Sequence, residues 1–226
     1  MTKLLHRFHP PLIGILLLLP PLGSAEELSL QSTGTGWDFL LKGATVSDPW
    51  LVQESPNLTD WKDLIFFDSR EAGETTTTAS VETAELADPD SRQRFFRAIK
   101  LPSDEAAARA PSLDCLRKWR RTAPDRYRFV IDENAGQLSW TATVVVDNDE
   151  IESVVFTDVF PDFIDPTPVT ITGLFERIEQ AFESEAETVQ GTWDPTFGYP
   201  VTGFIDFSTL IADDQRSWTI TDFEVL

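Results

Sequence analysis

Residues 170–182, TITGLFERIEQAF, decide the fold prediction for the C-terminal half of the chain. The apolar residues of this stretch and its flank repeat at i, i+3, i+4, i+7 and i+11, which is the spacing of one helix face: Ile171, Leu174, Phe175, Ile178 and Phe182. The outer side carries Glu176, Glu179, Glu183 and Glu185. Thr170 stands directly before the run, where its hydroxyl can cap a helix. The pattern predicts an amphipathic helix that lies across one face of a sheet.

Strand-like segments stand on both sides of this helix. Alternating apolar residues precede it at 127–131, 138–146 and 151–156, and similar runs follow it at 188–193, 201–207 and 217–223. Asn148-Asp149 suits the tight turn of a hairpin, which needs positive φ. An earlier helix is predicted after Pro111, with Ser112 as its cap and an apolar side made of Leu113, Leu116 and Trp119. This order predicts an α+β domain at 112–226, an antiparallel sheet with two helices on one face.

The N-terminal half has a different pattern, without a helical period. Short apolar or alternating runs occur at 28–31, 37–41, 50–53, 64–67, 76–81 and 94–100, separated by turn-forming residues. They predict a small all-β, sandwich-like module at 26–101. Residues 102–111 are rich in alanine with proline at both ends, and they are interpreted as a linker or a short helical spacer.

The start of the chain has the order of a secretory signal peptide. Lys3 and Arg7 precede the apolar run 11–20, and the small residues Gly23 and Ala25 follow it. We therefore expect residues 1–25 to be cleaved and the protein to be exported, to the periplasm or beyond the cell. No second apolar segment is long enough for a membrane span, so none is expected after cleavage.

The net charge and the histidine content limit the partners and the catalytic mechanisms that the protein can use. The net charge is −20 and becomes −22 when Lys3 and Arg7 leave, which argues against nucleic acid as a partner. Both histidines, His6 and His9, leave as well, so Ser-His-Asp and Cys-His catalysis and the usual histidine-based zinc and copper sites are excluded. Carboxylate catalysis and oxygen-ligated calcium stay open.

Cys115 is the only cysteine, and it excludes an intramolecular disulfide. Among apolar residues of a predicted helix it is interpreted as a small core residue rather than a reactive thiol. An intermolecular disulfide stays open.

The C-terminal half also resembles a known family. The matching residues are Trp119, Tyr127–Phe129, the hairpin at 147–150, 171–178, the stretch 193–200 (WDPTFGYP), 205–206, 212–214 and 218–223. With these residues it resembles the bacterial domain-of-unknown-function family 6174, whose members look like small exported or lipid-anchored proteins without assigned activity. Many members carry cysteines after the first strand. The corresponding residues 132–137 hold none here, so no redox or metal role of those cysteines is implied.

The N-terminal half resembles a short β module of secreted bacterial proteins. The resemblance rests on the pattern Trp50, Ser55, Leu58, Trp61 and the strand 94–98. That module has no known catalytic residues. Trp50 and Trp61 are interpreted as core aromatics, with stacking on sugars as the alternative.

The stretch 193–200 holds the candidate binding residues. One interpretation is a rigid hairpin loop in which Asp194 accepts hydrogen bonds from loop amides. The other makes Trp193, Phe197 and Tyr199 one wall of a binding site, with Asp206, Asp213 and Asp214 nearby. Asp213-Asp214 could bind calcium, but no loop has the acidic spacing of an EF-hand. No catalytic residue, metal site or cofactor is therefore predicted.

Three functional hypotheses follow. The first is a non-enzymatic exported protein that binds a protein or envelope partner. The alternative is a carboxylate-dependent hydrolase of envelope or extracellular glycans, which needs two acids facing each other across a cleft. The third is an inhibitor or chaperone-like protein that uses the uncovered sheet face.

Overall fold

The chain forms two compact units, Met1–Ser103 and Asp104–Leu226. The structure is a computed structural model and describes residues 17–18, 27–42, 49–67, 76–86, 93–136, 138–157 and 167–226. The predicted signal peptide lies outside these residues apart from Leu17 and Leu18. In the described part of the chain, no helix is both long and apolar enough to cross a membrane.

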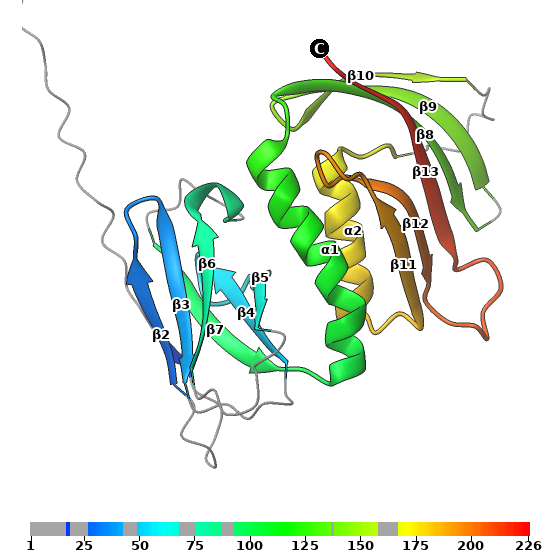
Figure 1. The fold of residues 1–226 in the computed structure, drawn as a ribbon. Helices are drawn as coiled ribbons and strands as arrows, with labels where there is room; N and C mark the ends of the chain where they lie inside the picture. The colour runs from blue at the N-terminus through cyan, green and yellow to red at the C-terminus, as the bar shows by residue number, and fades with distance from the viewer. Residues whose placement is uncertain are drawn as a thin grey trace, which may run out of the picture. The chain divides into compact units, whose positions relative to one another are not determined.

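The described residues of the first unit form two sheets (Figure 1). One sheet has the order β1-β7-β4-β5, made of β1 (Leu17–Leu18), β7 (Phe95–Lys100), β4 (Trp50–Ser55) and β5 (Lys62–Phe67). The other has the order β2-β3-β6, made of β2 (Glu27–Ser32), β3 (Gly36–Lys42) and β6 (Thr76–Glu82), and the short helix η1 (Thr83–Glu85) follows β6. Phe39 of one sheet meets Phe96 of the other edge to face, with ring centroids 5.1 Å apart, within one shared core. The six predicted strands and their sandwich-like packing are confirmed.

The Ser-x-x-Leu-x-x-Trp pattern forms the turn between β4 and β5. The Ser55 hydroxyl accepts hydrogen bonds from the backbone N–H groups of Asn57 and Leu58, at 3.2 and 2.9 Å. The indole of Trp61 donates to the Leu58 carbonyl at 3.1 Å, and the Arg97 guanidinium covers its ring at 4.2 Å. Trp50 lies in the core, 3% exposed, as predicted, whereas Trp61 is only half-buried. The pattern therefore has a structural explanation in this unit.

The second unit contains a sheet of the order β10-β9-β8-β13-β12-β11, in which every neighbouring pair is antiparallel. Its strands are β8 (Arg126–Ala135), β9 (Leu138–Asp147), β10 (Glu150–Phe156), β11 (Thr188–Trp193), β12 (Pro200–Asp206) and β13 (Arg216–Val225). Two three-stranded meanders thus join through the pairing of β8 with β13. Asn148 and Asp149 have φ of 50° and 61°, as the predicted hairpin turn requires.

Both helices, α1 (Ser103–Thr122) and α2 (Ile171–Glu183), pack on the same face of this sheet (Figure 1). Trp119 of α1 meets Tyr127 of β8 with ring centroids 5.4 Å apart. The first backbone N–H of α2, at Ile171, donates to the Tyr127 hydroxyl at 3.3 Å. Thr170 caps α2 by accepting from the Gly173 N–H at 3.2 Å, as predicted. The α+β class, the two helices and the antiparallel sheet are confirmed.

The start of α1 differs from the prediction. The helix begins at Ser103 rather than after Pro111, and it runs through the segment predicted as a linker or helical spacer. Ser112 does not cap it, because its hydroxyl donates to the Arg109 carbonyl within the helix. The alanines at 106–108 favour helix strongly, and they continue it across the missing N–H of Pro111. Leu113, Leu116 and Trp119 are buried, as expected.

Candidate functional site

The stretch 193–200 forms a fixed turn between β11 and β12. One carboxylate oxygen of Asp194 accepts hydrogen bonds from the backbone N–H groups of Thr196 and Phe197, at 2.9 and 2.6 Å. The Gly198 N–H returns to the Asp194 carbonyl at 3.0 Å, and Gly198 has φ of 88°. A Cβ at Gly198 would lie 2.7 Å from the Cys115 carbonyl oxygen, so only glycine fits against α1.

The same turn is tied to the end of α1. The Lys118 ammonium donates to the Pro195 carbonyl, and the Thr122 hydroxyl donates to the Phe197 carbonyl at 3.2 Å. Burial, and after it the charge of Asp114, raise the pKa of the Cys115 thiol, which keeps it protonated and unreactive. The turn therefore holds α1 on the sheet, and Cys115, interpreted from the sequence as a core residue, is only half-buried.

Two aromatic residues of the turn pack on rings of β13 and α1. Tyr199 stacks on Phe223 of β13 with ring centroids 4.5 Å apart, and Phe197 lies 5.5 Å from the same ring. Trp119 of α1 approaches Tyr199 at 6.4 Å, edge to face. Trp193 points elsewhere and stacks on Phe175 of α2 at 5.7 Å. Four rings, those of Trp119, Phe197, Tyr199 and Phe223, thus form one packed cluster, and Trp193 belongs to a different contact.

The predicted acidic residues lie at the other end of β12. Asp206 ends the strand, whereas Tyr199 precedes its first residue, so the two are separated by about 20 Å of extended chain. Asp213 and Asp214 follow in the loop before β13. The structure therefore does not bring the aromatic and acidic candidates together in one site.

Asp206 and Asp214 lie close to each other. Asp206 is 6% exposed. Desolvation, then the charge of the adjacent Asp214 side chain, raise the pKa of Asp206. Asp213 has φ of 75° and is exposed. Within the described ranges, no three His, Cys, Asp or Glu side chains are grouped so that they could together hold a metal ion.

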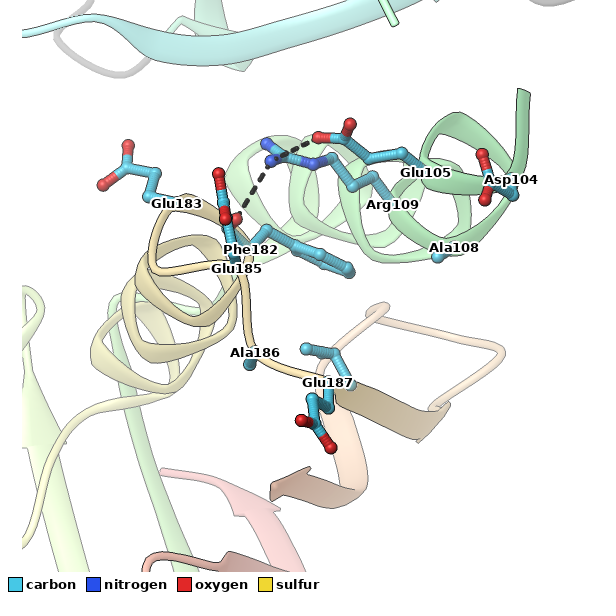
Figure 2. Close-up of a pocket in the computed structure, with 10 residues that line it drawn as sticks. Asp104, Glu105, Ala108, Arg109, Phe182, Glu183, Glu185, Ala186 and Glu187 are labelled. Carbon is cyan, nitrogen blue, oxygen red and sulfur yellow. Dashed lines mark hydrogen bonds and ion pairs between the residues drawn. The ribbon is translucent and has the colours of Figure 1, made fainter. Parts of the chain in front are cut away.

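A hollow of about 500 Å³ lies in the second unit between the first turns of α1, the end of α2 and the start of β11 (Figure 2). Its carboxylates are Asp104, Glu105, Glu183, Glu185 and Glu187. Its other lining residues are Ala108, Arg109, Phe182, Ala186 and Val189. We call this the acidic hollow, because five carboxylates stand against one guanidinium, together with apolar residues.

The one guanidinium of the acidic hollow is held in place by its neighbours. Arg109 forms an ion pair with Glu105 at 2.7 Å and donates to the Phe182 carbonyl at 3.2 Å. It also lies over the Phe182 ring, 5.0 Å from the centroid (Figure 2). A hydrogen bond from the Thr209 side chain, and after it the one from the Thr209 backbone N–H at 2.8 Å, lower the pKa of Glu187. The hollow therefore keeps excess negative charge at neutral pH.

Sequence reasoning missed the acidic hollow, although a signal existed. The sequence pattern places Glu183 and Glu185 on the outer face of a helix, and it places the acids at 104–105 in a linker or short helical spacer. Only the true start of α1 brings these two groups together. The acid-rich run 183–187 after an apolar stripe was the available signal.

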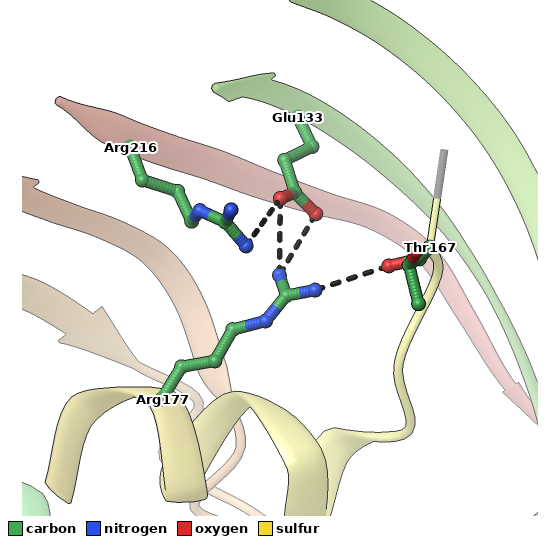
Figure 3. Close-up of polar contacts among 4 residues, drawn as sticks. All are labelled: Glu133, Thr167, Arg177 and Arg216. Carbon is green, nitrogen blue, oxygen red and sulfur yellow. Dashed lines mark hydrogen bonds and ion pairs between the residues drawn. The ribbon is translucent and has the colours of Figure 1, made fainter. Parts of the chain in front are cut away.

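A second unpredicted feature is a charged network beneath α2 (Figure 3). Glu133 of β8 is 2% exposed, on the same face as Ile131 and Phe129. Arg177 of α2 donates from one nitrogen to both Glu133 oxygens at 3.0 Å and from another to the Thr167 carbonyl at 3.1 Å. Arg216 of β13 stands 3.4 Å from the same carboxylate. The network joins three elements through one buried carboxylate.

Burial sets the electrostatics of this network. Burial lowers the pKa of Arg177, and the neighbouring Glu133 carboxylate opposes this effect. The Glu133 carboxylate faces the covered interior rather than an opening, and Arg177 occupies both of its oxygens. We therefore assign the network a structural role.

Comparison with known proteins gives one match. A family model described as "Family of unknown function (DUF6174)" matches residues 113–225, which is half of the chain and nearly all of the second unit. No curated protein and no solved structure matches the chain.

Proposed function

We propose that the second unit of this chain, which belongs to the family of unknown function (DUF6174), is a binding domain for a cationic ligand. The family description names no activity. The observation that carries the proposal is the acidic hollow, with five carboxylates around about 500 Å³. A volume of this size holds a small ligand or a few side chains of a peptide. Its one cation is already engaged by Glu105, so the remaining carboxylates attract positive charge from outside.

The apolar lining adds a second requirement for the ligand. Phe182, Ala186 and Val189 line the hollow together with the acids. A lysine or arginine side chain fits this arrangement, because its methylene stem packs on apolar surface while its charged end reaches carboxylates. The proposed ligand is therefore a basic peptide segment or a similar amine.

The hydrolase alternative has less support. A general acid needs a raised pKa and a place in the cleft, opposite a second carboxylate. Asp206, whose pKa is raised, does not line the acidic hollow, and the pKa of Glu187, which does, is lowered. We therefore favour binding without catalysis.

Titration calorimetry with a short oligolysine peptide tests the proposal. The full chain should bind it, and binding should weaken as ionic strength rises. The double variant Glu183→Gln, Glu185→Gln should weaken binding about thirtyfold, because each of the two removed charges contributes about 1 kcal/mol across water at contact distance. The matched control is Glu150→Gln, Glu176→Gln, two exposed acids that do not line the hollow. Equal losses in both double variants would assign the binding to net charge and reject the hollow.

We further propose that the protein acts outside the cytoplasm. The support is the basic start, the apolar run at 11–20 and the small residues at 23 and 25. N-terminal sequencing of protein recovered outside the cytoplasm of the expressing cell should begin at Glu26. Recovery of full-length chain in the cytoplasm alone would contradict export.

A further inference from the structure

Asp206, the buried last residue of β12, and Asp214, a half-buried residue of the loop before β13, have buried carboxylate oxygens without partners. Asp206 is 6% exposed, and its Oδ1 is buried without a hydrogen-bond partner among the described residues. Both carboxylate oxygens of Asp214 are also buried without a hydrogen-bond partner among the described residues. Buried polar atoms in folded proteins nearly always have a hydrogen-bond partner or a charged partner. Three unpartnered carboxylate oxygens close together therefore need a positively charged partner.

The surroundings of the pair add negative charge. The side chains of Asp206 and Asp214 lie within hydrogen-bonding reach of each other, and the Glu187 carboxylate is close enough to act on Asp206. The Ser208 backbone donates a hydrogen bond to Asp206. Two carboxylates in contact repel each other, and a cation between them removes this repulsion.

The number of orphaned oxygens distinguishes a cation from a proton. One shared proton joins one oxygen of Asp206 to one oxygen of Asp214, and it leaves the third buried oxygen unpaired. A divalent cation can contact all three oxygens at once. Calcium accepts six to eight oxygen ligands and takes many of them from backbone carbonyls and water, so two carboxylates are enough to anchor it.

The loop that carries Asp214 is held on both sides. Glu187 accepts from the Thr209 N–H at 2.8 Å, and the Gly136 N–H of the β8–β9 turn donates to the Gln215 carbonyl at 2.9 Å. A Cβ at Gly136 would lie 2.5 Å from the Asp213 carbonyl oxygen, so the backbones approach closely there. The two carboxylates therefore face each other on an ordered backbone, which favours binding over rearrangement.

From these observations we infer that Asp206 and Asp214 form a site for a calcium-type divalent cation at the end of β12. Glu187 contributes charge rather than a ligand bond, because one of its oxygens is held by Thr209. An oxygen-only donor set selects calcium over zinc or copper, which favour nitrogen and sulfur. The site is distinct from the acidic hollow and does not depend on the binding function proposed for it.

Calorimetric titration of the chelator-treated full chain with calcium chloride tests the site. We expect saturable binding of one calcium ion per chain at neutral pH. The unfolding temperature of the second unit should rise by about 10 °C when free calcium exceeds its Kd about a hundredfold. Asp206→Asn and Asp214→Asn should each abolish both effects.

Asp213→Asn is the matched control. It removes the same charge from the adjacent residue, and asparagine tolerates the φ of 75° found there. It should bind calcium within about twofold of the original chain. Glu187→Gln should weaken the affinity several-fold and retain the one-to-one stoichiometry, because it removes charge and no ligand.

The original chain alone can overturn the inference, even if a variant fails to fold. No calcium binding would reject the site, and a higher unfolding temperature at lower pH would then identify a shared proton between the two carboxylates instead. Calcium binding that Asp213→Asn abolishes equally would assign the ion to general surface charge. Either result rejects the site.

Discussion

The Glu133→Gln variant is expected to lower the free energy of unfolding of the second unit by about 3–5 kcal/mol, the usual cost of removing one partner of a buried ion pair. Glu133 is 2% exposed and accepts two hydrogen bonds from Arg177, whose side chain is only 15% exposed. Without the carboxylate charge, the Arg177 guanidinium stays buried beside Arg216 with no counter-charge from Glu133. Urea unfolding followed by circular dichroism measures the loss.

Glu224→Gln is the matched control, since it makes the same chemical change in the same sheet. Glu224 pairs with Arg128 at 2.5 Å, but both side chains are about half exposed, at 53% and 47%. Such a pair contributes about 0–1 kcal/mol. Similar losses in the two variants would show that the Glu133 network is no more important than a surface pair.

Trp119→Ala should lower the same free energy of unfolding by about 3–5 kcal/mol, as for other buried tryptophans replaced by alanine. Trp119 is 2% exposed and contacts the rings of Tyr127, Tyr199 and Phe223, at 5.4, 6.4 and 6.2 Å. Its indole N–H also donates to the Thr172 hydroxyl at 3.3 Å. The substitution therefore leaves a cavity at the point where α1, the sheet and the turn at 193–200 meet.

Trp193→Ala provides the comparison for this variant. Trp193 is half-buried and its ring stacks on a single described ring, that of Phe175, so we expect a loss of about 1–2 kcal/mol. The same unfolding experiment compares the two substitutions. A small loss for Trp119→Ala would indicate that its cluster is an adaptable binding surface rather than core, as the second interpretation of this stretch requires.

The internal hydrogen bonds of the family motif at 193–200 could be predicted from its own residues. The prediction that Asp194 bonds loop amides follows from backbone chemistry and is confirmed. The positive φ of Gly198 in the same turn has the same kind of local explanation. The packing of this turn against the end of α1 could not be predicted in the same way. The contacts of Lys118 and Thr122 with this turn join residues more than 70 positions apart.

The acidic candidates show the opposite outcome. Asp206, Asp213 and Asp214 were grouped with the aromatic residues because they are near in sequence. A strand is extended, so the length of β12 separates them from Tyr199 by about 20 Å. The acidic hollow, in contrast, joins residues 104–109 to residues 182–189, which are distant in sequence.

The amino-acid sequence by itself determined strands β2 to β13, helix α2 with its Thr170 cap, the hairpin at Asn148-Asp149 and the α+β class. These depend on hydrophobic period and turn chemistry, which act within a few residues. The sequence did not indicate β1, because Leu17 and Leu18 fall within the predicted signal peptide. Only the tertiary structure decided that Glu133 is buried between two arginines, that Asp206 faces Asp214, and that the start of α1 and the end of α2 enclose an acidic hollow. Each of these is a contact between distant segments, and its energy depends on burial and on the distance between charges, which no local pattern of residues encodes.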